Sequence, residues 1–415
     1  MGLIRNRIAV TLLGSAALWI AACGGGGGGG ASPAASTNAT VLVIQNVNPA
    51  TGPNVQSISV DSGLANNNVN VVFTNVTLCK PNTTLCQTID RILVDTGSTG
   101  LRILNTALSA SLSLTQQTDS SGSPVVECAQ FASGYAWGPV KVADIKIAQE
   151  QASAWPIQVI GDPDFSMVPS NCSSGGPALN ASQTLGANGI LGLGVFRYDC
   201  GATCASSAVA GAYYVCPAAG CQPTMQPLAR QVQHPVAGFA TNNNGVIIQL
   251  PAIPDTGASR VNGELVFGIG TQTNNGLANA VAITLNSTGN FTTQYNNRSF
   301  LRSFIDSGSN GVFFRDTSIS QCVRTAGFYC PPATLNLTAT AVGTNGAVNA
   351  VNFSVANLET LTTNNPTFFA FNNIGGALGS FNQFDFGLPF FFGRNVFVAI
   401  EGANTPAGPG PYFAF

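Results

Sequence analysis

Charged residues are scarce in this chain. Asp, Glu, Lys and Arg make up only 8% of its 415 residues, and the formal net charge is −2. Soluble domains ordinarily carry about a quarter of such residues. Because the chain has no surplus of positive charge to match a phosphate backbone, we expect no nucleic acid partner.

Histidine is nearly absent as well. His234 is the only one, and a Ser-His-Asp site could be built only around it, without supporting residues nearby in the sequence. The unbroken glycine tract at residues 24–30 lacks the Lys-Ser/Thr that completes a phosphate-binding loop. These absences argue against a serine hydrolase and a nucleotide-binding protein, and we expect no cofactor.

Long hydrophobic runs are confined to the N-terminus. Residues 8–20 form an apolar run after Arg5 and Arg7, which is typical of a signal peptide and too short to be a confident membrane span. The run ends in residues 18–23, Leu-Trp-Ile-Ala-Ala-Cys, which resemble the bacterial lipobox. That resemblance implies cleavage after residue 22 and lipidation of Cys23. The alternative is an ordinary secretory signal with an incidental cysteine.

Residues 23–40 are expected to form a flexible, glycine-rich linker behind the lipid anchor. Gly24 is not an aspartate, which by the same resemblance favours the outer membrane over the inner one. We therefore expect a monomeric, lipid-anchored protein of the bacterial cell envelope, facing the periplasm or the cell surface. The rest of the chain is divided into an N-terminal part, residues 41–262, and a C-terminal part, residues 263–415.

Without Cys23, ten of the eleven cysteines remain, which is an even number in an exported protein. Disulfides are therefore expected, and zinc is disfavoured because nearby histidine is lacking. The expected pairs are Cys79–Cys86, Cys322–Cys330 and, by elimination, Cys128–Cys172, while the pairing within the cluster Cys200, Cys204, Cys216 and Cys221 stays open.

Glycine, asparagine, threonine and serine take the place of the missing charge, which favours strands and turns over helices. We expect a mostly β fold with one helical stretch at residues 104–114. Alternation around central glycines predicts a long hairpin over residues 127–147. The other predicted strands lie at residues 41–44, 69–73, 92–95, 188–194, 263–268, 335–340, 352–355 and 412–415.

One short motif occurs twice in full. Residues 92–98, Ile-Leu-Val-Asp-Thr-Gly-Ser, and residues 304–309, Phe-Ile-Asp-Ser-Gly-Ser, each run from apolar strand-forming residues into an aspartate at a sharp turn. Two copies predict two related halves with one aspartate each. Asp61-Ser62-Gly63 and Asp255-Thr256-Gly257 are interpreted as plain turns, because the first continues into leucine and the second follows a proline.

The doubled motif resembles the active-site turns of pepsin-like aspartic proteases. In that family a later apolar-apolar-Gly segment threads beneath each turn, and here residues 190–192 and 391–393 follow the two motifs at similar distances. The resemblance implies a bilobal fold of double-psi β-barrel lobes, with a cleft between them. The chain also resembles a group of Gram-negative lipoproteins known only as a domain of unknown function, which implies a location and no activity.

By this resemblance, Asp95 and Asp306 hold a water between the lobes, one as general base and the other as general acid. Two carboxylates held close together share one proton because they cannot both ionise cheaply, a rule for which aspartic proteases are themselves the standard example. Glycine N–H groups and serine hydroxyls would support the pair, and two hydroxyls would bond across the lobes. The supporting residues implied are Thr96, Gly97, Ser98, Ser307, Gly308 and Ser309.

The predicted hairpin corresponds to the flap that closes over substrate in that family, and it departs from the family's pattern. Phe131 stands where the family has a tyrosine, and Arg102 stands where it has the tryptophan that partners this tyrosine. Tyr135 and Trp137 are candidate replacements. The phenylalanine-rich residues 368–392 are expected to form core and groove wall.

We therefore expect an extracytoplasmic, lipid-anchored aspartic endopeptidase that acts on a peptide or protein substrate, with neither metal nor cofactor. The alternative is a catalytically silent pepsin-like scaffold that binds peptides or envelope partners. A third interpretation is a structural envelope lipoprotein in which the paired turns only brace the lobes.

Overall fold

The computed structural model describes residues 49–415. The signal peptide, Cys23, the linker and the strand predicted at residues 41–44 lie outside the described residues. Within residues 49–415, none of the helices combines the length and the apolar character needed to cross a bilayer. The described chain is mostly β, as expected, and its α-helices are short: α1 Ser170–Ser173, α2 Ser182–Leu185, α3 Ala202–Ser206 and α4 Leu358–Asn364.

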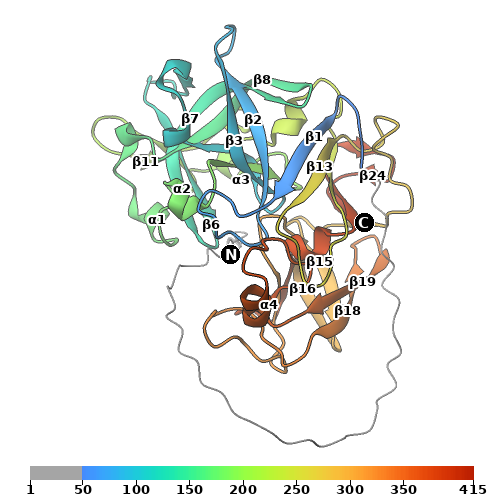
Figure 1. Ribbon diagram of the computed structural model, residues 1–415. Coiled ribbons are helices and arrows are strands. Elements are labelled where there is room, and N and C mark those ends of the chain that lie inside the picture. Colours follow the sequence, from blue (N-terminus) through green and yellow to red (C-terminus); the bar gives the residue numbers. More distant parts are fainter. Residues whose placement is uncertain (1–48) are drawn as a thin grey trace, which may run out of the picture.

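Two sheets carry the fold (Figure 1). The larger has 16 strands, in the order β11-β10-β6-β7-β8-β4-β9-β3-β2-β1-β13-β12-β22-β25-β14, with β5 beside β7. Its strands are β1 Val55–Val60, β2 Val72–Cys79, β3 Cys86–Asp95, β4 Thr99–Leu104, β5 Thr115–Gln116, β6 Val125–Phe131, β7 Gly134–Ile147, β8 Glu150–Ile160, β9 Gly189–Leu193, β10 Tyr213–Val215, β11 Gln222–Pro223, β12 Gly245–Leu250, β13 Val261–Phe267, β14 Ala282–Thr284, β22 Arg394–Ala399 and β25 Tyr412–Ala414.

The smaller sheet has seven strands, in the order β19-β18-β15-β16-β21-β17-β20. It is built from the second half of the chain and occupies the lower part of Figure 1. Its strands are β15 Phe291–Tyr295, β16 Arg298–Ile305, β17 Val312–Phe314, β18 Leu335–Val342, β19 Val348–Val355, β20 Gly375–Ala377 and β21 Gln383–Phe386, while β23 Asn404–Thr405 and β24 Gly408–Pro409 form a separate ribbon.

Strands from both ends of the chain meet in the larger sheet. β1 pairs antiparallel with β13, and β12 pairs antiparallel with β22. The expected division between residues 262 and 263 therefore falls inside β13, which belongs to the same sheet as the N-terminal strands. The C-terminal strands β22 and β25 join the two parts of the molecule through backbone hydrogen bonds rather than through a loose linker.

Most predicted strands are confirmed with shifted ends, and the hairpin is confirmed as β6 and β7. Two predictions need correction. The strand expected at residues 69–73 starts at Val72, because the Asn70 side chain and backbone bond to the distant chain around Phe371. The helix expected at residues 104–114 is wrong: two 3-10 turns occupy it, and the Ser109 side chain accepts the Ser111 N–H in place of a helical partner.

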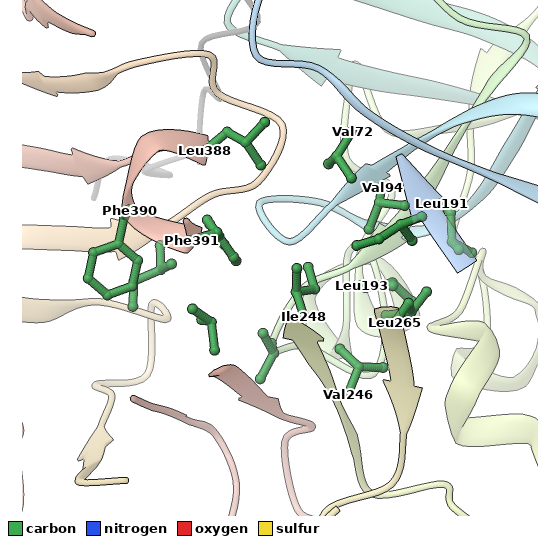
Figure 2. Close-up of a cluster of buried hydrophobic side chains, with 14 of the residues drawn as sticks. Val72, Val94, Leu191, Leu193, Val246, Ile248, Leu265, Leu388, Phe390 and Phe391 are labelled. Atoms are coloured by element: carbon green, nitrogen blue, oxygen red, sulfur yellow. The ribbon is translucent and has the colours of Figure 1, made fainter. Parts of the chain in front are cut away.

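The main core lies between the sheets. Apolar side chains from β2, β3, β9, β12 and β13 converge there with those of the 3-10 turn η6, Leu388–Phe391 (Figure 2). Val94 and Leu191, which flank the first motif, are both fully buried in this cluster. The turn that carries Asp95 is thus anchored in packed apolar side chains, which restricts its movement.

Five disulfides join cysteines that are mostly near neighbours in sequence. The three expected pairs are confirmed, and the cluster that stayed open pairs as Cys200–Cys204 and Cys216–Cys221. Cys128–Cys172 closes the longest loop and fixes the hairpin to α1. Because these cysteines are oxidised, they present no thiolates to zinc.

Candidate functional site

The first Asp-Thr-Gly turn follows directly from a buried strand. β3 pairs in parallel with β9, so that Asp95 lies opposite Gly192 at the end of both strands. The Asp95 carboxylate accepts the N–H of Gly97 at 2.9 Å and the hydroxyl of Ser98. A side chain on Gly192 would collide with the backbone of Thr99, so only glycine allows the two segments to pass this closely.

The second turn repeats this arrangement. Asp306 follows β16, and its carboxylate accepts the N–H of Gly308 at 2.8 Å and the hydroxyl of Ser309 at 2.8 Å. β21 lies between β16, with which it pairs in parallel, and β17, with which it pairs antiparallel. In the first half, β9 lies in the same way between β3, its parallel neighbour, and β4, its antiparallel neighbour. The two motifs therefore share their strand topology as well as their sequence.

Reciprocal hydrogen bonds join the two turns. The Thr96 hydroxyl donates to the carbonyl of Ile305 at 3.0 Å and accepts the N–H of Ser307 at 2.9 Å. The Ser307 hydroxyl donates to the carbonyl of Val94 at 2.7 Å and accepts the N–H of Thr96 at 3.1 Å. Four buried bonds between residues more than 200 positions apart fix the turns face to face.

This contact brings the two carboxyl groups together. An added Cβ on Gly97 would lie 2.7 Å from the Asp306 carboxyl group, and one on Gly308 would lie 2.7 Å from that of Asp95. Each carboxyl group thus sits against the glycine of the opposite turn. Both aspartates are fully buried, at 0% exposure.

Burial and neighbouring charge favour the protonated form of Asp306. Burial raises the pKa of the Asp306 carboxyl well above its usual range, and the negative charges of Asp95 and Asp385 raise it further. The Ser309 hydroxyl opposes the shift because it stabilises the charged form. Asp306 therefore favours its protonated form.

A comparison with known families covers this whole arrangement. The sequence pattern of the family described as protein of unknown function (DUF3443) matches residues 50–415. The chain belongs to this family. No curated protein matches the chain. Both turns, both sheets and all five disulfides of this DUF3443 protein lie within the matched residues, and the description of the family assigns no activity to them.

The segment beneath the second turn differs from the expected one. Residues 391–393 do not pair with the strand that leads to Asp306. Asp385 and Phe386 do, Gly387 follows them directly, and the Asp306 N–H donates to the Phe386 carbonyl. Phe391 ends a 3-10 turn instead. The apolar-apolar-Gly pattern pointed to the wrong glycine because an aspartate interrupts the apolar run before Gly387.

Asp385 is a functional candidate that sequence reasoning missed. It is 1% exposed, and neither of its carboxylate oxygens has a hydrogen-bond partner among the described residues. Burial raises its pKa well above its usual range, and the charge of Asp95 raises it further. The sequence offers one signal for it, a charged residue inside the apolar run Phe384 to Phe386, where a strand core would otherwise be uninterrupted.

A cavity lies against the paired turns. Thr96 and Gly97 line it from the first turn, Val195 and Phe196 from the segment after β9, and Phe304 and Gln383 from the smaller sheet. It holds about 470 Å³ of empty space, part of which is open to solvent. The cavity therefore borders the first turn on one side.

The aromatic flap candidates of this DUF3443 protein are packed into its interior. Phe131 is 3% exposed among apolar side chains that include Leu93 and Ile190. The Trp137 indole N–H donates to the Phe165 carbonyl at 2.8 Å, and the ring is buried. Tyr135 is half-buried and pairs through its backbone with residue 178. Their contacts are those of core residues.

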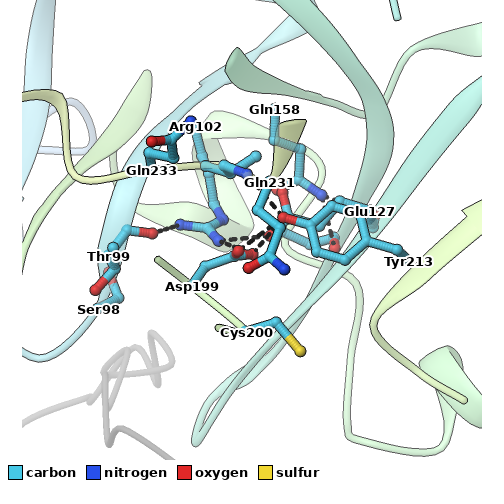
Figure 3. A network of polar contacts seen from close by, with 12 residues as sticks. Ser98, Thr99, Arg102, Glu127, Gln158, Asp199, Cys200, Tyr213, Gln231 and Gln233 are labelled. Atoms are coloured by element: carbon cyan, nitrogen blue, oxygen red, sulfur yellow. Dashed lines mark hydrogen bonds and ion pairs between the residues drawn. The ribbon is translucent and has the colours of Figure 1, made fainter. Parts of the chain in front are cut away.

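Arg102 forms a buried ion network with Glu127 and Asp199 (Figure 3). Its guanidinium also donates at 2.6 Å to the carbonyl of Thr99, the residue that directly follows Ser98. The Tyr213 hydroxyl donates to Asp199 at 2.7 Å. Burial, and then the charge of Glu127, raise the pKa of Asp199 well above its usual range. The Arg102 side chain therefore holds the chain directly after the first turn.

The remaining candidates have structural contacts. Asp61 forms an ion pair with Arg91, and Asp255 lies exposed in a turn where its side chain accepts from Asn372. His234 is fully buried, and burial lowers its pKa to about 3, so its imidazole is neutral. None of these three residues belongs to the paired turns.

Proposed function

We propose that this protein is an aspartic endopeptidase with a pepsin-like, bilobal fold. One observation carries the proposal: two turns of similar sequence and the same strand topology face each other, and each carboxyl group lies against the glycine of the other turn. The reciprocal bonds of Thr96 and Ser307 support it further, because they hold two buried carboxyl groups close enough to share a proton.

The proposed chemistry gives each carboxyl group a different role. Asp95, as the carboxylate, would take a proton from a water that attacks the peptide carbonyl. Asp306, which burial and charge keep protonated, would donate its proton to the carbonyl oxygen. When the C–N bond of the tetrahedral intermediate breaks, Asp95 would pass its proton to the leaving amine, and Asp306 would take a proton back from a hydroxyl group of the intermediate. Gly97 and Gly308 N–H groups and the two serine hydroxyls hold the carboxyl groups in place for both steps.

A second candidate is a pepsin-like scaffold that binds peptides without cleaving them. Two observations favour it: both aspartates are fully buried, and the hairpin aromatics pack inside the molecule. Hydrolysis therefore requires that the segments covering the pair move to admit substrate. A scaffold with a permanently closed pair would bind through its outer surface alone.

The experiment is cleavage of a diverse peptide library by the purified full-length chain from acid to neutral pH, with and without pepstatin. We expect cleavage that is abolished in Asp95→Asn and in Asp306→Asn, and that declines as rising pH removes the Asp306 proton. Asp255→Asn is the matched control, since it changes an aspartate in the same Asp-Thr-Gly sequence in an exposed turn. Peptide binding by the wild type without cleavage at any pH would favour the scaffold.

We also propose that the chain is exported and anchored by a lipid on Cys23, and that the anchor lies in the outer membrane. The signal-like N-terminus supports this, and five disulfides in the described fold are typical of an oxidising compartment. Cys23→Ser should move the protein from the membrane fraction to the soluble fraction and prevent incorporation of labelled fatty acid. A variant that stays in the membrane fraction would contradict the anchor.

A further inference from the structure

Asp385 lies beside the aspartate pair without any partner that would compensate its burial. It interacts with Asp95 and Asp306 through charge, yet no hydrogen-bond donor reaches its oxygens among the described residues. The Ser309 hydroxyl favours its charged form, but that hydroxyl gives its one proton to Asp306 at 2.8 Å. The carboxyl group is therefore available to a ligand.

Asp385 shares one face of the smaller sheet with two residues that line the cavity, although it does not line the cavity itself. Asp385 pairs with Phe304 across β21 and β16, so the two side chains lie on one face of the sheet, together with Gln383 two residues earlier. Phe304 and Gln383 both line the cavity beside the first turn. The same face thus offers an aromatic wall, an amide and, next to the paired aspartates, an acid.

Burying a carboxyl group without a partner is energetically unfavourable, and charged residues are scarce in this protein. Burial without a partner disfavours the ionised form, and the group holds a proton instead. A cation entering the cavity would reverse this, because it would pair with the carboxylate in a site already shielded from water. Arg302 lies on the same face opposite Gln383, but it forms no ion pair with Asp385 within the described chain.

We propose that Asp385 is a specificity-determining residue that binds the cationic side chain of a lysine or arginine next to the cleaved peptide bond. The inference rests on the proposed function, since it names the substrate class for that site. The apolar part of the substrate side chain would lie along Phe304, and its charged end would bind the Asp385 carboxylate. The Gln383 side-chain amide would accept a hydrogen bond from the same charged group. Asp385 makes no bond to the reacting carbonyl, so its role is recognition.

The test uses pairs of peptides that differ only in lysine or uncharged norleucine, placed on either side of the cleaved bond. We expect the wild type to prefer lysine in kcat/KM by about tenfold or more on one side, as expected for a hydrogen bond to a charged group. Asp385→Asn should reduce this ratio to near one. Asp164→Asn, which removes an exposed aspartate, is the charge-matched control and should keep the wild-type ratio. A wild type without preference, or a preference that survives in Asp385→Asn, would overturn the proposal.

Two further measurements keep the inference separate from the proposed function and from misfolding. If no peptide is cleaved, the proposed function fails, and the dissociation constants of the same two peptides for the wild type and for Asp385→Asn decide the recognition role. If Asp385→Asn does not fold, Gln383→Glu serves instead, because it adds a charge to the same wall of the cavity. We expect it to increase the lysine preference; an unchanged ratio would show that the side chain does not enter there.

Discussion

Thr96 and Ser307 show how two hydroxyl groups can align a pair of buried carboxyl groups. Each hydroxyl donates to one strand-end carbonyl and accepts one N–H of the opposite turn, and both side chains are buried. A buried N–H or carbonyl that loses its partner costs about 1–3 kcal/mol. The geometry of the carboxyl groups therefore depends on two side chains that never touch them.

We expect Thr96→Val to lower the free energy of unfolding by about 2–4 kcal/mol, because it leaves the Ile305 carbonyl and the Ser307 N–H unpaired. Thr96→Ser is the control: it keeps both bonds and loses only a methyl group, worth about 1 kcal/mol. Urea unfolding followed by tryptophan fluorescence measures both variants. Equal losses in the two would show that packing, rather than the hydroxyl bonds, stabilises the turn.

The raised pKa of Asp385 makes the free energy of unfolding depend on pH. Because its pKa is raised on folding, the folded protein holds this proton more tightly than the unfolded chain does. Asp385 therefore destabilises the folded protein increasingly as the pH rises from the pKa of the unfolded chain, about 4, toward the pKa of the folded protein. Asp385→Asn should be about as stable as the wild type near pH 4 and more stable at pH 7, by about 1 kcal/mol or more, since a tenfold change in proton affinity is worth about 1.4 kcal/mol. Denaturant unfolding across this pH range tests it; parallel curves would contradict the expectation.

The buried network of Arg102 links separate elements behind the first turn. Arg102 belongs to β4, Glu127 to β6 and Tyr213 to β10, while Asp199 lies in the loop before α3. The Arg102 guanidinium is 3% exposed and Glu127 is 2% exposed, so neither charge is screened by water. Removing one partner would leave the other charge buried without compensation.

We expect Arg102→Met to lower the free energy of unfolding by about 3–5 kcal/mol, because it leaves the buried Glu127 carboxylate without its ion-pair partner. The double variant Arg102→Met with Glu127→Gln should recover part of that loss, since no uncompensated buried charge remains at position 127. Thermal and urea unfolding of the two single variants and the double variant form a cycle that measures the coupling. A double variant as unstable as the sum of the singles would mean that the two charges do not interact.

At the scale of the whole molecule, Asn70 ties the chain ahead of β2 to the second half. Its amide donates to the carbonyls of Asn310 at 2.9 Å and Phe371 at 2.8 Å, and its carbonyl accepts the Phe371 N–H at 2.7 Å. It adopts a left-handed backbone conformation with φ of 54°. Asn310 follows Ser309 directly, so this bridge reaches the turn that holds Asp306.

We expect Asn70→Ala to destabilise the protein by about 3–5 kcal/mol, because it removes three buried hydrogen bonds and strains the backbone at positive φ. Asn70→Gly separates the two effects, since glycine tolerates this conformation but makes no side-chain bonds. Hydrogen exchange of residues 306–311 should accelerate in both variants. Unchanged exchange there would mean that the bridge does not support the second turn.

The sequence by itself determined the local features of this protein. Strand periodicity, the doubled Asp-Thr/Ser-Gly-Ser turn and the spacing of neighbouring cysteines are set by residues close together in the chain, and these predictions describe the observed strands, turns and disulfides. Their joint use in catalysis is still a proposal.

Only the tertiary structure decided which distant segments meet. The parallel register of β16 and β21 selected Gly387 instead of Gly393 and brought Asp385 beside the pair. Folding also buried Arg102 against Glu127 and packed Phe131 into the core. The physical reason is that the apolar pattern of a strand specifies which of its faces is buried. Which strands pair with it depends on contacts between segments far apart in the chain, and a short stretch of sequence does not specify those contacts.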